Sequence, residues 1–179
     1  RYKYESNGNT VEVAGYDVDG QPCWYKEGIA KTTFKYDERG NVIEEAYYDT
    51  DGQPCLGKEG YAKIVVQYDD RGNIIEMAYL DTNEQPCLCR AGYSKVVKQF
   101  DEQGNITKET FCGTNGLPCM VQEGYSQLSY QYDDCGNRIG CIFYDANGQI
   151  CLNDYWYAKW LSKYDSLGNK VEVTYYGID

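Results

Sequence analysis

The sequence lacks histidine altogether, and it has few positive charges and no long apolar run. The absence of histidine excludes histidine general bases, Ser/His/Asp and Cys/His nucleophile pairs, and zinc sites that use imidazole. Lysine and arginine number 17 against 28 aspartates and glutamates, and the resulting net charge of −11 repels a nucleic-acid backbone. The longest apolar runs have only a few residues, with 64–66 a typical case, so we expect no insertion into a membrane.

A repeat of 32 residues runs through the whole chain. The dipeptide Gly-Asn marks it, and a cysteine keeps the same step, with proline before it in four of five copies. The glycines are Gly8, Gly40, Gly72, Gly104, Gly136 and Gly168, and the cysteines are Cys23, Cys55, Cys87, Cys119 and Cys151. We therefore interpret residues 1–179 as a single repeat domain of about five and a half units. The chain begins with arginine and shows no leader, so we expect a processed or excised piece.

Each unit has the pattern of antiparallel β-structure, and no stretch shows a helical period. In the second unit, β-rich segments at 61–68 and 74–80 flank the turn 69–73, whose glycine is expected in the left-handed conformation. In the preceding unit a second turn, at 49–54, leads into a short segment that ends at Leu56. The predicted fold is all-β: a tandem array of antiparallel β-hairpins that forms an elongated, twisted sheet or a solenoid-like strip.

Alternation along these strands predicts one apolar face and one mixed face. If Tyr68 pairs with Asn73, then Val66 shares the apolar face with Met77 and Tyr79. A slip of one residue would exchange the two faces, so the register is well specified.

The recurring motif Tyr-Asp-x-x-Gly-Asn, seen at 36–41 and 68–73, resembles the YD repeat of the bacterial RHS-repeat family. It recurs in every unit, although Glu5 stands in the aspartate position of the first copy and Phe100 in the tyrosine position of the fourth. The unit is longer than the usual YD repeat. The resemblance implies a secreted or surface-exposed bacterial protein. In that family β-hairpins spiral into a strip or shell that can encase a toxin or bind glycans.

The five repeating cysteines are interpreted as small apolar packing residues rather than disulfide or metal ligands. Equivalent cysteines of neighbouring units should lie roughly 10–14 Å apart, beyond the separation of about 7 Å that a disulfide allows between Cα atoms. The total of nine is odd, so at least one thiol stays unpaired within a monomer. The disulfide state of the others is left open: Cys89, Cys112, Cys135 and Cys141. Cys112 could reach Cys119 diagonally across its hairpin, and the Cys87-x-Cys89 pair lacks the second pair of a zinc ribbon.

Acidic turns recur once in most units, beginning at Asp17, Asp49, Asp81 and Asp145. They resemble the opening of a calcium loop, but they lack the distant glutamate that normally closes one. Aspartate and asparagine followed by glycine also suit a turn for backbone reasons, which is the preferred interpretation. A calcium-stabilised module is the alternative, and its melting temperature would rise with calcium.

Aromatic side chains on the mixed face are the candidate ligand-binding site. In the expected register Tyr125 faces Tyr144 and Tyr157 faces Tyr176. The candidate ligand-binding residues are Tyr48, Tyr61, Tyr125, Tyr144, Tyr157 and Tyr176. Such rings can stack on sugars, and the alternative is that they fill the core of the array.

Three tryptophans depart from the repeat pattern. They are Trp24, Trp156 and Trp160, and their places indicate that the two ends of the array carry the unit-specific surfaces.

The expected function is non-catalytic, with no cofactor and no metal. Carboxylates recur at the same positions in every unit, whereas a catalytic pair should be a local exception to the repeat. We expect a module of an extracellular or cell-surface protein that binds a glycan or a protein partner. The alternative is a purely structural stalk or shell segment, which would bury its tyrosines. Bare strand edges would also allow an edge-mediated dimer.

Overall fold

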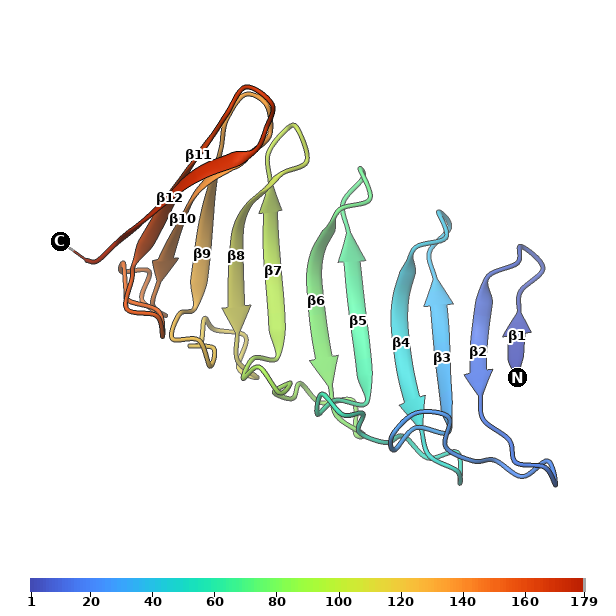
Figure 1. The fold of residues 1–179 in the computed structure, drawn as a ribbon. Coiled ribbons are helices and arrows are strands. Elements are labelled where there is room, and N and C mark those ends of the chain that lie inside the picture. The colour runs from blue at the N-terminus through green and yellow to red at the C-terminus, as the bar shows by residue number, and fades with distance from the viewer. Residues whose placement is uncertain (179) are drawn as a thin grey trace. The chain divides into compact units, whose positions relative to one another are not determined.

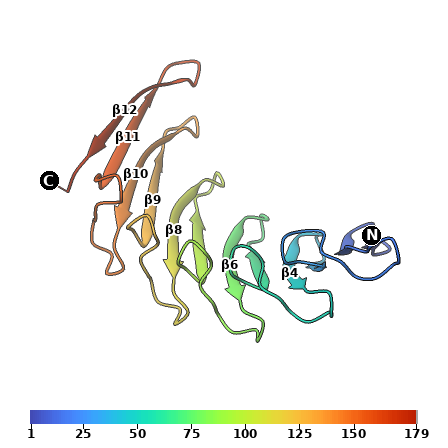
Figure 2. The ribbon, with the colours of Figure 1, turned by 60° about the horizontal axis from the view of Figure 1, so that its bottom comes forward.

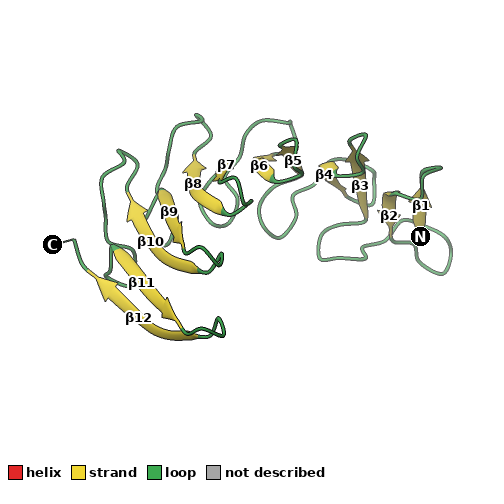
Figure 3. Cartoon of the chain, turned by 90° about the horizontal axis from the view of Figure 1, so that it is seen from above, coloured by secondary structure: helices red, strands yellow, loops and turns green. Residues whose placement is uncertain are grey.

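The computed structural model describes residues 1–178, and this range contains β-strands, turns and loops but no helix (Figure 3). The all-β prediction is confirmed. No helix in the described range is long and apolar enough to span a membrane. The chain divides into two compact units, Arg1–Arg90 and Ala91–Asp179, with six strands each. The expectation of a single repeat domain stays a prediction.

In each unit the strands follow one another in sequence order, and every neighbouring pair is antiparallel (Figure 1). The first unit contains β1 (Tyr2–Tyr4), β2 (Thr10–Ala14), β3 (Lys31–Tyr36), β4 (Val42–Tyr48), β5 (Lys63–Tyr68) and β6 (Ile74–Leu80). The second unit contains β7 (Lys95–Phe100), β8 (Ile106–Cys112), β9 (Gln127–Tyr132), β10 (Arg138–Tyr144), β11 (Lys159–Tyr164) and β12 (Lys170–Tyr176). The predicted array of hairpins is therefore present.

The Asp-x-x-Gly-Asn segment makes the tight turn of every hairpin after the first, in which Glu5 replaces the aspartate. In the β5–β6 hairpin the Asp69 carboxylate accepts hydrogen bonds from the backbone N–H of Arg71 (2.9 Å) and Asn73 (2.8 Å) and from the Asn73 side-chain amide (2.9 Å). Gly72 has a φ of 87°, in the left-handed region where glycine carries no Cβ penalty. The motif glycines share this conformation, at Gly40, Gly72, Gly104, Gly136 and Gly168. The expected left-handed glycine is thus confirmed.

These turns predict a loss of stability in acid. A hydrogen bond from the asparagine side chain lowers the pKa of the turn aspartate below its usual value of 3.8, and hydrogen bonds from backbone N–H groups lower it further. The aspartates are Asp37, Asp69, Asp101, Asp133 and Asp165. A lowered folded-state pKa stabilises the fold above the unfolded value, and this contribution disappears as the pH falls through the folded value. We expect the melting temperature to drop between about pH 5 and about pH 2. Thermal melts of Asn73→Ala should show a smaller drop than wild type, and an equal drop would contradict this assignment.

The register differs from the predicted one by two residues. Tyr68 pairs with Ile74 and Gln67 with Glu76, because a β-bulge leaves Ile75 as the extra residue next to the turn. A shift of two residues keeps every side chain on its face, so Val66, Met77 and Tyr79 still share the apolar face. The predicted Tyr68–Asn73 pair is wrong, and the predicted division into faces is correct.

A long connector joins each hairpin to the next at the end of the strands opposite the tight turns (Figures 1 and 2). After β4 the chain turns at Asp49, whose N–H bonds Gln53 O (2.9 Å), and then runs back beside the strand through a bridge between Tyr48 and Pro54. A second turn closes through a hydrogen bond from Gly57 N to Tyr61 O (2.8 Å). The short proline-led segment expected from the sequence is therefore a third, single-bridge strand.

A row of very small residues is buried where each connector enters its strand. They are Ala30, Ala62, Ser94, Ser126 and Ala158, spaced by the repeat. Their backbones bond both neighbouring strands: Tyr47 N donates to Ala62 O, and Ala62 N donates to Leu80 O (both 2.8 Å). These positions are at most 2% exposed, so the surrounding packing leaves little room for a larger side chain, which accounts for the repeated choice of alanine or serine.

The last strand, β12, has a hydrogen-bonded neighbour on one side, β11, within the described residues. Its apolar side chains Val171, Val173 and Tyr175 are consequently exposed. Tyr79 and Phe143, which occupy the position of Tyr175 in earlier repeats, are buried. Pairing of two chains along this edge stays a prediction.

Candidate functional site

The structure separates the six candidate tyrosines into two groups. Tyr144 pairs with Gln127 rather than with Tyr125, and Tyr176 pairs with Lys159 rather than with Tyr157. The predicted cross-strand pairs are therefore wrong. The physical reason is the same two-residue shift of the register that the bulge produces in the β5–β6 hairpin. Tyr125 and Tyr157 lie in the connector turn, where strand alternation does not decide on which face a ring lies.

The first group, Tyr48, Tyr144 and Tyr176, lies on the mixed face at the ends of its strands. Two of its rings receive cations from the neighbouring strand: Lys31 Nζ lies 4.4 Å from the ring centre of Tyr48, and Lys159 Nζ lies 5.5 Å from that of Tyr176. The Tyr144 hydroxyl lies 3.2 Å from Ser129 Oγ. These rings already have partners within the chain, and they lie apart from the second group.

The second group, Tyr61, Tyr125 and Tyr157, belongs to ladders of rings on the apolar face. In the first unit the Tyr61 ring lies between Tyr47 (5.8 Å between ring centres) and Tyr79 (4.7 Å), and all three rings are roughly stacked. Burial, with the nearby Glu45 carboxylate, raises the pKa of Tyr47 well above its usual value, so the hydroxyl stays protonated.

In the second unit a ladder of six rings has neighbouring centres 4.7 to 5.8 Å apart. Its members in order are Tyr93, Phe111, Tyr125, Phe143, Tyr157 and Tyr175. Most of the contacts are edge-to-face, a geometry that aromatic quadrupoles favour. Burial raises the pKa of Tyr125 to about 12. This ladder is a packing element, since Phe143 is buried and neighbouring rings cover both of its sides.

Sequence reasoning did not identify these ladders, although the repeat contains their signal. One aromatic residue lies two positions before the first residue of the connector turn, as Tyr47 lies before Asp49. Another directly follows the connector glycine, as Tyr61 follows Gly60. Both positions stay aromatic at the 32-residue step after the first repeat, which has Gly15 and Ile29 instead. Contact between them depends on the connector turn, which brings the second ring over the first strand.

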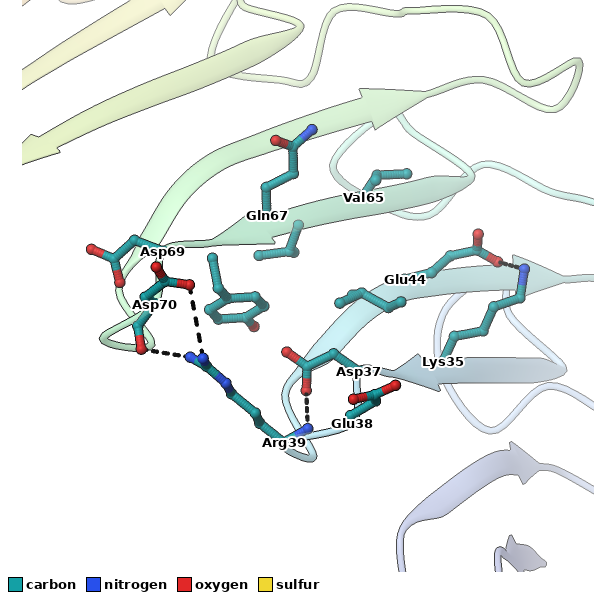
Figure 4. A pocket seen from close by; sticks show the side chains of 12 residues that line it. Lys35, Asp37, Glu38, Arg39, Glu44, Val65, Gln67, Asp69 and Asp70 are labelled. Atoms are coloured by element: carbon teal, nitrogen blue, oxygen red, sulfur yellow. Dashed lines mark hydrogen bonds and ion pairs between the residues drawn. The ribbon is translucent and has the colours of Figure 1, made fainter.

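A groove lies beside the hairpin tips in the first unit, and its volume is about 640 Å³ (Figure 4). Its apolar lining includes Ile43, Val66 and Tyr68. Arg39 reaches across it to the next hairpin, donating to Asp70 O (2.6 Å) and pairing with the Asp70 carboxylate (3.8 Å). The groove is thus a space between two hairpins with a charged bridge at its rim.

The carboxylates of this groove are already occupied by structural hydrogen bonds. The Asp37 carboxylate accepts hydrogen bonds from the backbone N–H of Arg39 and from the backbone N–H and side-chain amide of Asn41, and these bonds lower the pKa of Asp37. Glu44 pairs with Lys35 at 2.9 Å. An aspartate held ionised in this way is poorly suited to act as a general acid, which needs a raised pKa.

A related groove of about 520 Å³ occurs in the second unit, two repeats later. Asp101 and Asp133 take the places of Asp37 and Asp69, and Gln103 takes the place of Arg39. The groove therefore recurs with the repeat, although its charge differs from copy to copy.

None of the nine cysteines, all of which lie within residues 1–178, is joined in a disulfide, so the Cys112–Cys119 bridge does not form. The repeating cysteines are half-buried, and four of them lie near a glycine carbonyl of the preceding connector, as Cys55 Sγ does 3.4 Å from Gly28 O. Burial raises the pKa of Cys55 and raises that of Cys141 to about 12, so both thiols resist ionisation.

The acidic connector turns use their carboxylates for backbone hydrogen bonds. Asp49 Oδ1 accepts from the N–H groups of Asp51 and Gln53, both at 2.9 Å, and Asp17, Asp81 and Asp145 make the same pattern. Within residues 1–178, no group of three or more acidic, cysteine or histidine side chains is placed to hold a metal ion.

No protein-family model matches this chain, and no curated protein matches it. Among solved structures, it is similar to a chain of the Photorhabdus luminescens Tc holotoxin pore, with a TM-score of 0.46 and 12% identity over 97% of this chain. It is also similar to a chain in the crystal structure of TcdB2-TccC3-Cdc42, with a TM-score of 0.43 and 12% identity over 98% of this chain. In both cases the match spans 9% of the other chain's length.

Proposed function

We propose that this chain is a non-catalytic structural repeat module of a secreted or cell-surface bacterial protein, as the resemblance of its Tyr-Asp-x-x-Gly-Asn motif to the YD repeat implies. The observation that carries the proposal is the pair of ring ladders on the apolar face. A binding module would present its tyrosines to solvent, whereas here Tyr61, Tyr125 and Tyr157 pack against rings of neighbouring strands.

The polar groups support the same proposal. The turn aspartates hold their own backbone, and the lysines and glutamates of paired strands bridge one another, as Lys3 does with Glu12 (2.7 Å) and Lys163 with Glu172 (2.9 Å). The motif tyrosine connects successive hairpins: Tyr68 donates its hydroxyl hydrogen to Val42 O (2.9 Å), 26 residues earlier. Groups used in this way maintain the array.

The competing function is binding of a glycan or protein along the six tyrosines. Single substitutions, one in each of the two groups of tyrosines, distinguish this function from the structural one. We expect a broad glycan panel to give no saturable binding to the wild-type chain. Tyr125→Ala should lower the free energy of unfolding by about 2 kcal/mol, because it removes a ring between Phe111 and Phe143. Tyr144→Ala should cost less. Saturable glycan binding that Tyr144→Ala abolishes without changing the melting temperature would overturn the structural assignment.

A further inference from the structure

The connector between β10 and β11 departs from the repeat at two neighbouring positions. The first position is basic or neutral in the earlier connectors and acidic here: Asp154 takes the place of Lys26, Lys58, Arg90 and Gln122. The second position is glycine in the earlier connectors and tryptophan here: Trp156 takes the place of Gly28, Gly60, Gly92 and Gly124. Both changes lie in one loop of five residues, 153–157.

Trp156 keeps the backbone conformation of the glycines that it replaces. Its φ is 64°, in the left-handed region that a bulky side chain normally avoids. Asn153 holds the loop in this form: its carbonyl accepts the Trp156 N–H (2.9 Å), and its buried side chain accepts the Tyr155 N–H (3.0 Å). The indole is 80% exposed, so little packing offsets the backbone strain. Fold stability therefore does not explain a tryptophan at this position.

A second exposed ring and two acidic residues belong to the same pair of adjacent connectors as the indole. Tyr155 is 76% exposed, and its ring is roughly parallel to that of Tyr157, with 6.3 Å between the ring centres. The loop contacts the preceding connector, where Asp154 N donates to Glu123 O (2.9 Å), which places two acidic residues on adjacent backbone segments. We call Glu123, Asp154, Tyr155 and Trp156 the acidic aromatic patch.

The patch has no cation from its own chain. On the mixed face the rings of two tyrosines receive one: Lys31 Nζ lies 4.4 Å from the ring centre of Tyr48, and Lys159 Nζ lies 5.5 Å from that of Tyr176. Within the described residues no lysine or arginine lies over Tyr155 or Trp156, and none pairs with Asp154. An exposed indole two residues from an aspartate, in a chain of net charge −11, is complementary to a cationic group.

We propose that the acidic aromatic patch binds a basic polypeptide segment, with an arginine or lysine side chain over the indole of Trp156 and its charge paired with Asp154. Cation–π contact and ion pairing act together at such a site, because the carboxylate holds the cation over the ring. This interaction surface is additional to the structural function proposed above and does not depend on it.

The probe is a synthetic octapeptide of alternating arginine and serine, titrated calorimetrically into the full chain at about 50 mM salt. We expect saturable binding, and we expect the peptide with citrulline in place of arginine not to bind, since citrulline keeps the shape without the charge. Trp156→Gly should weaken binding by about 3- to 30-fold, and Asp154→Asn should weaken it as well. Trp156→Gly restores the glycine of the other connectors, so it should fold with an unchanged or higher melting temperature.

Trp24→Ala is the matched control, because Trp24 is also exposed but lies in the first unit, outside the patch. It should bind the arginine peptide as wild type does. Equal affinity of wild type and Trp156→Gly would mean that net charge alone attracts the peptide, and the proposal would fail. The proposal would also fail if the citrulline peptide bound as tightly as the arginine peptide. It would fail as well if the chain bound a neutral oligosaccharide instead of the arginine peptide, and Trp156→Gly abolished that binding.

Discussion

Replacement of Phe143 by alanine is expected to lower the free energy of unfolding by about 3–5 kcal/mol. Phe143 is 7% exposed, pairs across the sheet with Leu128, and lies between the rings of Tyr125 (5.2 Å) and Tyr157 (5.5 Å). Truncation removes the transfer free energy of the ring, leaves a cavity, and breaks two edge-to-face contacts at once. Urea denaturation followed by circular dichroism would measure the loss.

Two further variants make this result specific. Phe143→Leu, which keeps most of the apolar volume, should cost less than about 1.5 kcal/mol. Val171→Ala, on the exposed edge strand β12, should change stability by less than about 0.5 kcal/mol. If Phe143→Ala cost no more than Val171→Ala, the ladder would contribute nothing to stability, and the structural function would lose its main support.

The second large effect is expected at Gly15, where alanine should destabilise the fold by about 1–3 kcal/mol. A Cβ atom at this position would lie 2.3 Å from Cys23 O and 3.1 Å from the Tyr25 Cβ. The carbonyl cannot easily move away, since Cys23 N donates to Gly15 O (3.1 Å) and Gly15 N donates to Ala30 O (2.9 Å). Thermal and urea denaturation would both report the loss.

Gly177→Ala is the control, because a Cβ there would meet no atom within 4 Å. It should leave the melting temperature nearly unchanged. The Gly15 prediction also opposes the repeat consensus, since the same position in later repeats is aromatic, as at Tyr47 and Phe143. Substitution toward a consensus commonly stabilises a protein. A stable Gly15→Ala variant would show that the first connector can move away from β2.

The faces of the sheet could be predicted from the sequence, and the register could not. Side chains alternate between the two faces with a period of two. Val66 and Tyr79 are therefore assigned to the same apolar face even when the register of the two strands is shifted by two residues. The bulge that displaces Tyr68 from Asn73 to Ile74 depends on the backbone geometry of the turn. That geometry results from the hydrogen bonds of the Asp69 carboxylate, which alternation does not report.

The contacts of the candidate tyrosines could be predicted only in part, and binding by them stays a prediction. The repeat pattern indicates that Tyr61, Tyr125 and Tyr157 make equivalent contacts, and they do. The expected cross-strand partners are wrong because the register is shifted by two residues, and the expected face is wrong because strand alternation does not extend into the connector turn. The position of a side chain in a turn depends on hydrogen bonds such as that from Gly57 N to Tyr61 O, rather than on a pleat.

The 32-residue period, the hairpins, the left-handed turn glycines and the apolar face all follow from local signals in the chain, since each depends on residues a few positions apart. The ring ladders and the close approach at Gly15 were decided by tertiary structure. Both depend on where a connector of some fourteen residues returns the chain to the sheet. Trp156 combines both levels, since Asn153 of its own loop holds the glycine-like conformation and a hydrogen bond from Asp154 N to Glu123 O attaches that loop to the preceding connector.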